Sequence, residues 1–327
     1  MGLLNLFLAH LLLCGFQVAC IGPGSENQGK TDTIYNTALT LGATEFIKLV
    51  DTSPWVKDQL TTSTQFTVFV PDNEAFKTMS KETRKALENP NVVDWVLRYH
   101  MAIGIHPARD YKHNLLIPSA FKPSEGGYSL QSLRVNIYEA FSGGHRKVYT
   151  VSGAKVFKPD YECTNGLIHI VKKVIYPIPT GINIAEFFSV DPRFSMLNQL
   201  LQKVNLTSAL ATEPTKPLTV FAPSDEAIKK LTPEQQKKLN NATYLNQTLL
   251  THVVGDAYYY GGFYDFKTFK SLNGKQLVME MGPGGVTIQQ KMLVGFDITL
   301  TNGVVHILSE VILPKGNERE EMFFYQN

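Results

Sequence analysis

Apolar positions along the chain follow two spacings, and each spacing occurs in both halves. Residues on one helix face recur every three or four positions near the start of each half. A β-branched and aromatic run follows, and a proline ends it. The helical positions are Phe46, Leu49 and Val50, then Phe194, Leu197, Leu200 and Leu201; the runs are residues 66–70 and 218–222. The pattern therefore predicts a helix followed by a strand in both halves.

Helix-start signals follow both predicted strands. Asp72 and Ser224 are good N-caps, and Ser80 begins a further helix. Thr232-Pro233-Glu234-Gln235 combines a hydroxyl cap, a first-turn proline and a Gln that can complete a capping box. Later residues indicate strands, most clearly around Asn273-Gly274, a dipeptide that suits a two-residue hairpin turn. Helices first and strands later predict an α+β fold.

Two landmarks return in the same order, which indicates a duplicated unit. Residues 67–76 (TVFVPDNEAF) return 152 positions later at 219–228 (TVFAPSDEAI). Residues 164–169 (TNGLIH) return 137 positions later at 301–306 (TNGVVH). A unit of about 140 residues has the size of a whole domain and is too long for a solenoid repeat. The chain is therefore a tandem of two domains.

The landmarks also place the domain boundaries. We expect a first domain at residues 31–179, a second at 181–316 and a polar tail at 317–327. The linker at 177–181 is short and rich in proline, which limits the mutual orientation of the domains. The first domain has an insertion of about 15 residues within 104–160, a basic segment that we interpret as a solvated loop. The alternative is a site for sulfated glycans or acidic surfaces.

The N-terminus indicates an exported protein. Residues 3–18 are almost all apolar and Val18-Ala19-Cys20 suits cleavage, so we expect a signal peptide at 1–20. An uncleaved anchor is the alternative, although the run is short for a membrane span. Three sequons predict N-glycosylation of the second domain, at Asn205, Asn241 and Asn246. We expect a secreted protein of the extracellular space or matrix, with no stable membrane anchor.

Cysteines are too few to hold this fold together. The chain has three, Cys14, Cys20 and Cys163. Cleavage after Cys20 would leave Cys163 as a single thiol, either buried or able to pair between molecules. Cleavage before Cys20 would allow a bridge between these two residues. In either case the domains depend on hydrophobic cores.

The repeated segments resemble the fasciclin domain. The resemblance rests on the Thr-Val-Phe-Ala-Pro segment, a helix that ends in His, and an Asn-Gly-Val-Val-His strand, and it covers roughly residues 31–315. It implies a β-wedge or sandwich with helices packed on one side. It also implies an extracellular protein of adhesion or matrix, which binds cell-surface receptors such as integrins or other matrix proteins.

Two short motifs within the resemblance are candidate partner-binding sites. Tyr99-His100 resembles the tyrosine–histidine motif that vertebrate adhesion proteins of the family use for integrin contact, whereas the second copy has Thr251 before its histidine. Asp297-Ile298 resembles the Asp-Ile pair that precedes the Asn-Gly strand in the same relatives, and the first copy departs from it with Asp160-Tyr161. Core or turn positions are the alternative for both motifs.

Neither a catalytic nor a metal site is predicted. His100, His169, His252 and His306 match between the copies but lack the close spacing of zinc ligands, so we expect buried histidines bonded to backbone. Short motifs for hydrolases, nucleotides and metalloproteases are absent, so we expect no enzyme and no cofactor.

The composition narrows the class of partner. A net charge of +2 gives no general attraction to nucleic acid. The leading function is the one that the resemblance implies, cell adhesion or matrix interaction. The alternative is a glycan or small-ligand binding protein that uses the basic insertion or a pocket between structural elements.

Overall fold

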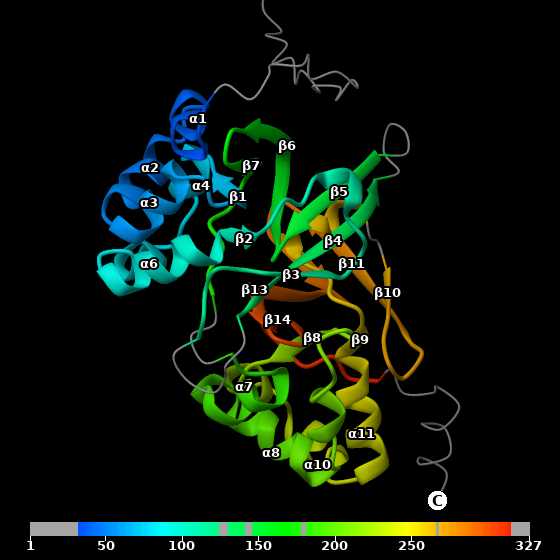
Figure 1. Ribbon diagram of the computed structural model, residues 1–327. Helices are drawn as coiled ribbons and strands as arrows, with labels where there is room; N and C mark the ends of the chain where they lie inside the picture. Colours follow the sequence, from blue (N-terminus) through cyan, green and yellow to red (C-terminus); the bar gives the residue numbers. More distant parts are fainter. Residues whose placement is uncertain (1–31, 124–129, 141–145, 178–180, 266–267, 315–327) are drawn as a thin grey trace, which may run out of the picture.

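The computed structural model describes residues 32–123, 130–140, 146–177, 181–265 and 268–314. Each half of the chain forms helices and one seven-stranded sheet, which confirms the α+β class. In Figure 1 the helices of the first domain lie at the upper left and those of the second at the bottom, with both sheets between them. The expected signal peptide and polar tail lie outside the described residues.

The first domain begins with helices and ends with strands. Its helices are α1 (Ile34–Thr40), α2 (Thr44–Asp51), α3 (Pro54–Thr61), α4 (Asn73–Lys77), α5 (Lys81–Ala86), α6 (Pro90–Tyr99) and the 3-10 turn η1 (Ala108–Asp110). Its strands are β1 (Phe66–Pro71), β2 (Met101–Ile103), β3 (Leu115–Pro118), β4 (Ser132–Ala140), β5 (Arg146–Val151), β6 (Ala154–Cys163) and β7 (Gly166–Val171).

The second domain repeats this order. Its helices are α7 (Ile184–Val190), α8 (Ser195–Lys203), α9 (Asp225–Lys229), α10 (Pro233–Lys238) and α11 (Ala242–Thr251), with 3-10 turns η2 (Pro192–Phe194), η3 (Ser208–Leu210) and η4 (Tyr260–Asp265). Its strands are β8 (Leu218–Pro223), β9 (Val253–Gly255), β10 (Thr268–Lys270), β11 (Gln276–Gly282), β12 (Gly285–Ile288), β13 (Lys291–Leu300) and β14 (Gly303–Leu308).

Both sheets curl until their ends almost meet. The strand order is β2-β1-β7-β6-β5-β4-β3 in the first domain and β10-β11-β12-β13-β14-β8-β9 in the second. Only the pairs β1–β7 and β8–β14 are parallel among these strands. A bridge joins Ala102, next to one end of the first sheet, to Ser119 beyond the other end, and Val254 and Ser271 do the same in the second. Each sheet is therefore barrel-like.

Strands β1 and β8 lie between two hydrophobic cores and are buried on both faces, and we call each of them the central strand of its domain. Val68 and Val70 of β1 belong to the core under the helices, whereas Phe69 belongs to the core inside the curled sheet. The alternation follows from the two-residue period of a strand. Phe69 and its counterpart Phe221 both have no exposed surface, which confirms them as equivalent core residues.

The predicted helix starts are confirmed. Asp72 accepts a hydrogen bond from the Ala75 amide at the start of α4, and Ser224 caps α9 in the same way. Ser80 caps α5. Thr232 and Gln235 form the reciprocal capping box of α10.

The asparagines of the two repeated Asn-Gly segments have a structural role that the sequence analysis did not predict. The Asn302 amide donates to the carbonyl oxygens of Leu210 (2.8 Å) and Thr212 (3.1 Å), while its Oδ1 accepts from the Ile184 amide (2.9 Å). Asn165 makes the equivalent three bonds in the first domain. Each asparagine thus ties the first helix of its domain to the segment before the central strand.

Two expectations are wrong in detail. The Asn273-Gly274 hairpin forms, but five residues, 271–275, connect the paired ends Lys270 and Gln276 instead of two. Within this connection only Gly274 has a positive φ. A two-residue turn of the Asn-Gly type needs a positive φ at both residues, so Asn273 does not form one. The basic segment is also not a loop throughout. Fewer than half of residues 104–160 form strands of the first sheet, β3 to β6, so the segment is a loop only in part. Residues 124–129 and 141–145 lie outside the described residues.

Candidate functional site

The residues predicted to bind partners lie inside the structure. Tyr99 and His100 have no exposed surface. The Asp297 side chain is 2% exposed. Ile298 is partly buried against the helical core of the second domain. None of the four is displayed on the outside of the molecule in this arrangement of the domains.

The matched histidines fasten the fold from within. His100 Nδ1 lies 2.8 Å from the Val96 carbonyl oxygen, and its Nε2 accepts from the Ile175 amide at 3.2 Å. His252 makes the equivalent bonds. Burial lowers the pKa of both histidines to about 4, so both are neutral at physiological pH.

The second histidine pair is also bonded to backbone. The Asp297 amide donates to His306 Nδ1 at 3.2 Å, and His306 Nε2 lies 2.8 Å from the Tyr258 carbonyl oxygen. His169 is placed in the same way in the first domain. The prediction of buried, backbone-bonded histidines is confirmed. No group of three or more His, Cys, Asp or Glu side chains that could hold a metal occurs in the described residues.

Asp297 is fixed between the domains. It adopts a positive φ of 55° on β13. Its Oδ1 accepts from the Tyr260 amide at 2.7 Å, and its Oδ2 lies 2.8 Å from Lys173 Nζ of the first domain. The carboxylate is therefore fully engaged by one backbone amide and one ammonium group.

The two candidate motifs meet at the contact between the domains. The Tyr99 hydroxyl lies 3.0 Å from Ser152 Oγ. Ser152, Asp297 and Ile298 line one interdomain cavity of about 220 Å³, together with residues 173–177. Sequence spacing could not predict this, because Tyr99 and Asp297 belong to different domains.

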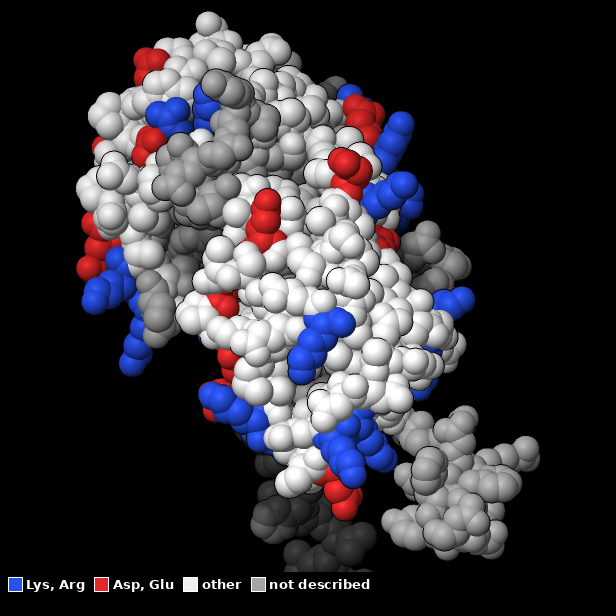
Figure 2. All heavy atoms as spheres, turned by 90° about the horizontal axis from the view of Figure 1, so that it is seen from below, with Lys and Arg blue, Asp and Glu red and all other residues white. Residues whose placement is uncertain are grey.

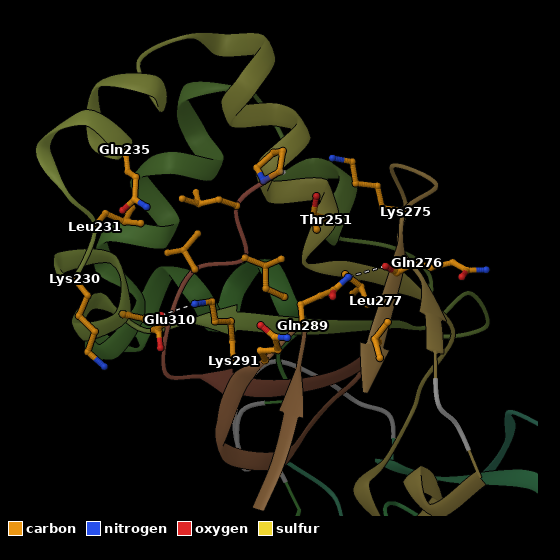
Figure 3. A pocket seen from close by; sticks show the side chains of 17 residues that line it. Lys230, Leu231, Gln235, Thr251, Lys275, Gln276, Leu277, Gln289, Lys291 and Glu310 are labelled. Carbon is orange, nitrogen blue, oxygen red and sulfur yellow. Dashed lines mark hydrogen bonds and ion pairs between the residues drawn. The ribbon is translucent and has the colours of Figure 1, made fainter. Parts of the chain in front are cut away.

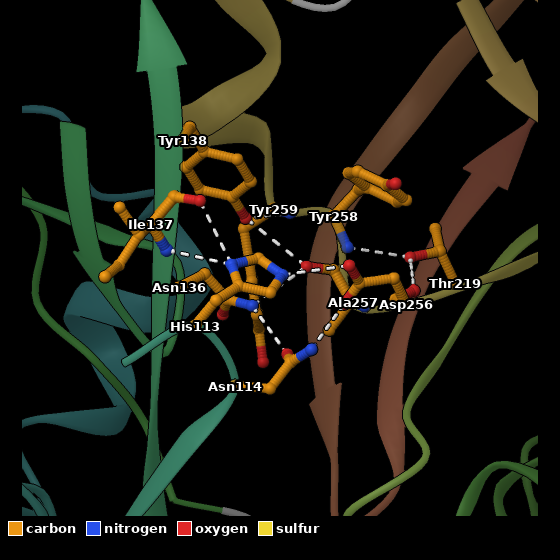
Figure 4. Close-up of polar contacts among 10 residues, drawn as sticks. All are labelled: His113, Asn114, Asn136, Ile137, Tyr138, Thr219, Asp256, Ala257, Tyr258 and Tyr259. Atoms are coloured by element: carbon orange, nitrogen blue, oxygen red, sulfur yellow. Dashed lines mark hydrogen bonds and ion pairs between the residues drawn. The ribbon is translucent and has the colours of Figure 1, made fainter. Parts of the chain in front are cut away.

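A second set of polar contacts joins the domains beside this cavity (Figure 4). His113 Nε2 lies 2.9 Å from Asp256 Oδ2, and the Asn114 amide donates to Asp256 Oδ1 at 2.7 Å. The Tyr138 hydroxyl accepts from the Tyr259 amide at 3.0 Å. We call His113, Asn114, Tyr138, Asp256 and Tyr259 the interdomain polar cluster.

The contact is close as well as polar. A Cβ atom added to Gly262 would lie 2.3 Å from the Tyr138 ring, and one added to Gly153 would lie 2.7 Å from the Tyr259 ring. Arg134, 3% exposed, donates to the Pro214 carbonyl oxygen of the second domain at 2.8 Å. Arg134 was expected in a basic loop, but it is buried between the domains and is not presented to a glycan.

Opposite pKa shifts mark the ion pair of the cluster. The hydrogen bond to Asp256 raises the pKa of His113 above its ordinary value, while burial and the nearby Arg134 oppose this rise. Burial acts to raise the pKa of Asp256, but hydrogen bonds from His113 and Asn114 together lower it. The pair is therefore charged on both sides between the lowered pKa of Asp256 and the raised pKa of His113.

We expect the His113–Asp256 contact to stabilise the protein most at mildly acidic pH. A pKa that folding raises contributes stability below the unfolded value, here 6.5, and this contribution disappears as pH rises through the folded value. The stability advantage of wild type over His113→Gln, below about 1 kcal/mol for a partly exposed pair, should therefore be present below pH 6.5 and shrink as the pH rises from there through the raised pKa of His113. Urea unfolding at several pH values measures it.

Asp256→Asn provides the matched control, because it keeps a hydrogen-bond acceptor and removes the charge. In that background the His113→Gln effect should no longer depend on pH. A pH-independent advantage in the wild-type background would contradict the assignment. The advantage should also fall again when the pH drops through the lowered pKa of Asp256.

The remaining sites predicted from the sequence are the three glycosylation sites, which lie in the second domain, and Cys163, which lies in the core under the helices of the first domain. Asn205 and Asn241 are exposed, whereas Asn246 is half-buried within α11. Glycosylation of all three asparagines stays a prediction. Cys163 is buried, and burial raises the pKa of its thiol. Cys20 lies outside the described residues, so the pairing of Cys163 stays open.

Surface charge and helix length add two further findings. On the face shown in Figure 2, basic and acidic side chains are interspersed among uncharged residues. Among the described helices, none is long and apolar enough to cross a bilayer.

Comparisons with known proteins agree with the duplicated architecture. Residues 41–177 and 192–314 each match the family model of the fasciclin domain. The chain is 25% identical over 285 residues to transforming growth factor-beta-induced protein ig-h3 of Sus scrofa, covering 86% of this chain and 39% of that protein. Human periostin is 25% identical over 287 residues, with 86% of this chain and 32% of periostin covered.

A solved FAS1 domain pair of the insect cell adhesion molecule fasciclin I aligns with 84% of this chain and 98% of its own, at 20% identity and a TM-score of 0.40. The chain thus spans well under half the length of the two curated relatives it matches.

Proposed function

Since this chain belongs to the fasciclin domain family, we propose that it is an extracellular interaction protein that binds cell-surface or matrix partners in adhesion. The observation that supports this most is the use of two fasciclin domains over 260 matched positions, 41–177 and 192–314. The four matched histidines, His100, His169, His252 and His306, are buried and bonded to backbone, and burial lowers the pKa of each. Their placement favours binding over an enzymatic role.

The Asp297-Ile298 and Tyr99-His100 contacts stay part of this proposal, under one condition. The Asp297 carboxylate is paired with Lys173, and Tyr99 faces Ser152 inside the domain contact. A receptor-bound cation could gain a carboxylate oxygen from Asp297 only after this ion pair opens. We propose that partner binding at these motifs requires the domains to separate locally.

Cell attachment to the immobilised full chain tests the proposal. We expect attachment that falls when divalent cations are chelated, because a carboxylate ligand acts through a receptor-bound cation. Asp297→Asn should reduce attachment, since it removes the charge but keeps an oxygen for the Tyr260 amide. Lys173→Met should increase attachment, because it frees the carboxylate without altering it.

Lys238→Met is the matched control, because Lys238 is exposed on α10, away from the interdomain cavity. Attachment that changes neither on chelation nor with Asp297→Asn and Lys173→Met would contradict the role of Asp297. No attachment to any matrix or cell surface above an unrelated immobilised protein would contradict the adhesion function itself.

A further inference from the structure

The interdomain cavity has a counterpart at the far end of the molecule. In the first domain, Ser152 and residues 173–177 form its wall. Their equivalents, 137 positions later, are Gln289 and residues 310–314, and all of these line a groove in the second domain. The two domains thus carry the same groove, between the helical layer and the curled sheet.

The first groove is filled by the second domain. Asp297, Ile298 and Thr299 of β13 complete its lining, and Asp297 pairs with Lys173 on its wall. We call residues 297–299 the inserted edge. One fasciclin domain therefore docks the edge of its β13-type strand into the groove of the domain that precedes it.

The second groove has no such edge in it among the described residues. It encloses about 840 Å³ between α9, α10 and α11 on one side and β11 and β12 on the other (Figure 3). Its floor is apolar, with Leu231, Leu277 and residues 311–313. Val278 at its wall is 43% exposed, whereas Arg134, at the equivalent strand position of the first groove, is 3% exposed.

That equivalence of Val278 and Arg134 follows from strand register. Val135 pairs with Val151 in the first sheet, and Met279 pairs with Ile288 in the second. Ile288 lies 137 positions after Val151. The residues just before Val135 and Met279 therefore correspond.

The first domain carries the matching free edge. The equivalents of the inserted edge are residues 160–162, Asp160-Tyr161-Glu162 of β6. The Asp160 side chain is 39% exposed, against 2% for Asp297. Ile105 beside it is 44% exposed, whereas its counterpart Ala257 in the second domain is fully covered. The edge that is buried in one domain is thus exposed in the other.

We propose that the free edge of one molecule docks into the free groove of a second copy of this chain, in the edge-in-groove arrangement that the two domains adopt within each molecule. The Lys173–Asp297 ion pair itself does not recur, because Glu310 stands in the second groove at the place of Lys173. The groove of one end and the edge of the other are different surfaces, so the association is head-to-tail and can continue beyond a dimer.

Charge supports this occupant. Lys230, Lys275 and Lys291 line the groove, and among the described residues only Lys291 has a carboxylate partner there, Glu310 at 2.6 Å. Lys291 thus pairs with the one acid that stands at the place of Lys173. The free edge presents two acids, Asp160 and Glu162, beside the single base Arg109. A groove with excess positive charge thus faces an edge with excess negative charge, which favours this pairing and orients it.

Sedimentation velocity of the full chain over a concentration series tests the proposal. We expect the sedimentation coefficient of wild type to rise with concentration, and to rise less at high salt. Lys275→Glu in the groove and Glu162→Lys on the edge should each weaken association about tenfold or more, because each places like charges together. Both residues are exposed, so neither change disturbs a core.

Mixing these two variants should restore association. Each retains one wild-type surface, and the Glu162 edge of one fits the Lys275 groove of the other. Lys238→Glu and Glu88→Lys are matched controls that reverse exposed charges outside both surfaces and should behave as wild type.

Three results would overturn the proposal. The first is a wild-type chain that stays monomeric at every concentration. The second is association that Lys275→Glu and Glu162→Lys leave unchanged. The third is association only after residues 316–327 are removed, because that segment, which follows the groove residue Pro314, would then be the occupant in the full chain. Adhesion does not depend on the outcome.

Discussion

Replacement of Phe69 or Phe221 by alanine should lower the free energy of unfolding by about 3–5 kcal/mol. Both rings are fully buried inside the curled sheets. Phe69 stacks on His169 with ring centroids 5.3 Å apart, and Phe221 stacks on His306 at 5.6 Å. Removing either ring loses apolar burial, leaves a cavity and takes away the packing that holds a buried histidine in place.

Urea unfolding followed by fluorescence measures the loss, with Phe157→Ala as the control. Phe157 is 40% exposed, so its replacement should cost below about 1 kcal/mol. The close contact between the domains also couples their stability. Because Tyr138, Arg134 and Lys173 all bond across the contact, loss of one domain should also destabilise the other. A loss below about 1 kcal/mol at both phenylalanines would contradict the core assignment.

Replacement of Asn302 by leucine should cost a similar amount. The substitution removes the partner of three backbone groups, the Ile184 amide and the carbonyl oxygens of Leu210 and Thr212. Each buried group left unpaired costs about 1–3 kcal/mol. Asn302 is 1% exposed, so water has little access to replace it. We expect a total loss of about 3–6 kcal/mol, or a protein that does not fold.

Asn165→Leu is the equivalent change in the first domain, and Asn91→Leu at an exposed position is the control. Thermal unfolding of the three variants against wild type compares them. A small loss for Asn302→Leu would contradict the tethering role of the asparagine. A loss as large for Asn91→Leu would show a general intolerance of leucine and would contradict it as well.

The elements themselves follow from local sequence. Residues near in the chain decide where helices start, which is why Asp72 and Thr232 were predicted as caps and are caps. Runs of β-branched and aromatic residues that end at a proline likewise predicted the strands around Phe69 and Phe221. The duplication determined that both domains have one fold.

Turn length and loop character were predicted less well. A dipeptide such as Asn273-Gly274 fixes local φ angles, but pairing with a neighbouring strand decides how many residues connect two strands. Charge and length in residues 104–160 suggested a loop, because neither is a signal of strand pairing. Pairing of β4 with β5 gives regular structure to part of that segment.

The candidate site depended most on tertiary structure. Motif resemblance pointed to Asp297 and Tyr99 as exposed contacts, but exposure depends on what packs over a residue. No local pattern reports that Lys173 and Ser152 of the first domain lie against Asp297 of the second. The interdomain polar cluster was missed for the same reason, because His113 and Asp256 stand at positions that the two copies do not share.

By itself the sequence determined the two-fold repeat, the α+β class, the caps and the central strands, since each depends on neighbours within a few residues or on the chain's own duplication. Only the tertiary structure decided which edge is covered and which is free. The edges at Asp160 and Asp297 are alike in sequence position, yet their side chains are 39% and 2% exposed. The physical reason is that a side chain is buried only where another surface packs over it. The first domain packs over the edge at Asp297, and no part of the described chain packs over the edge at Asp160 in the same way.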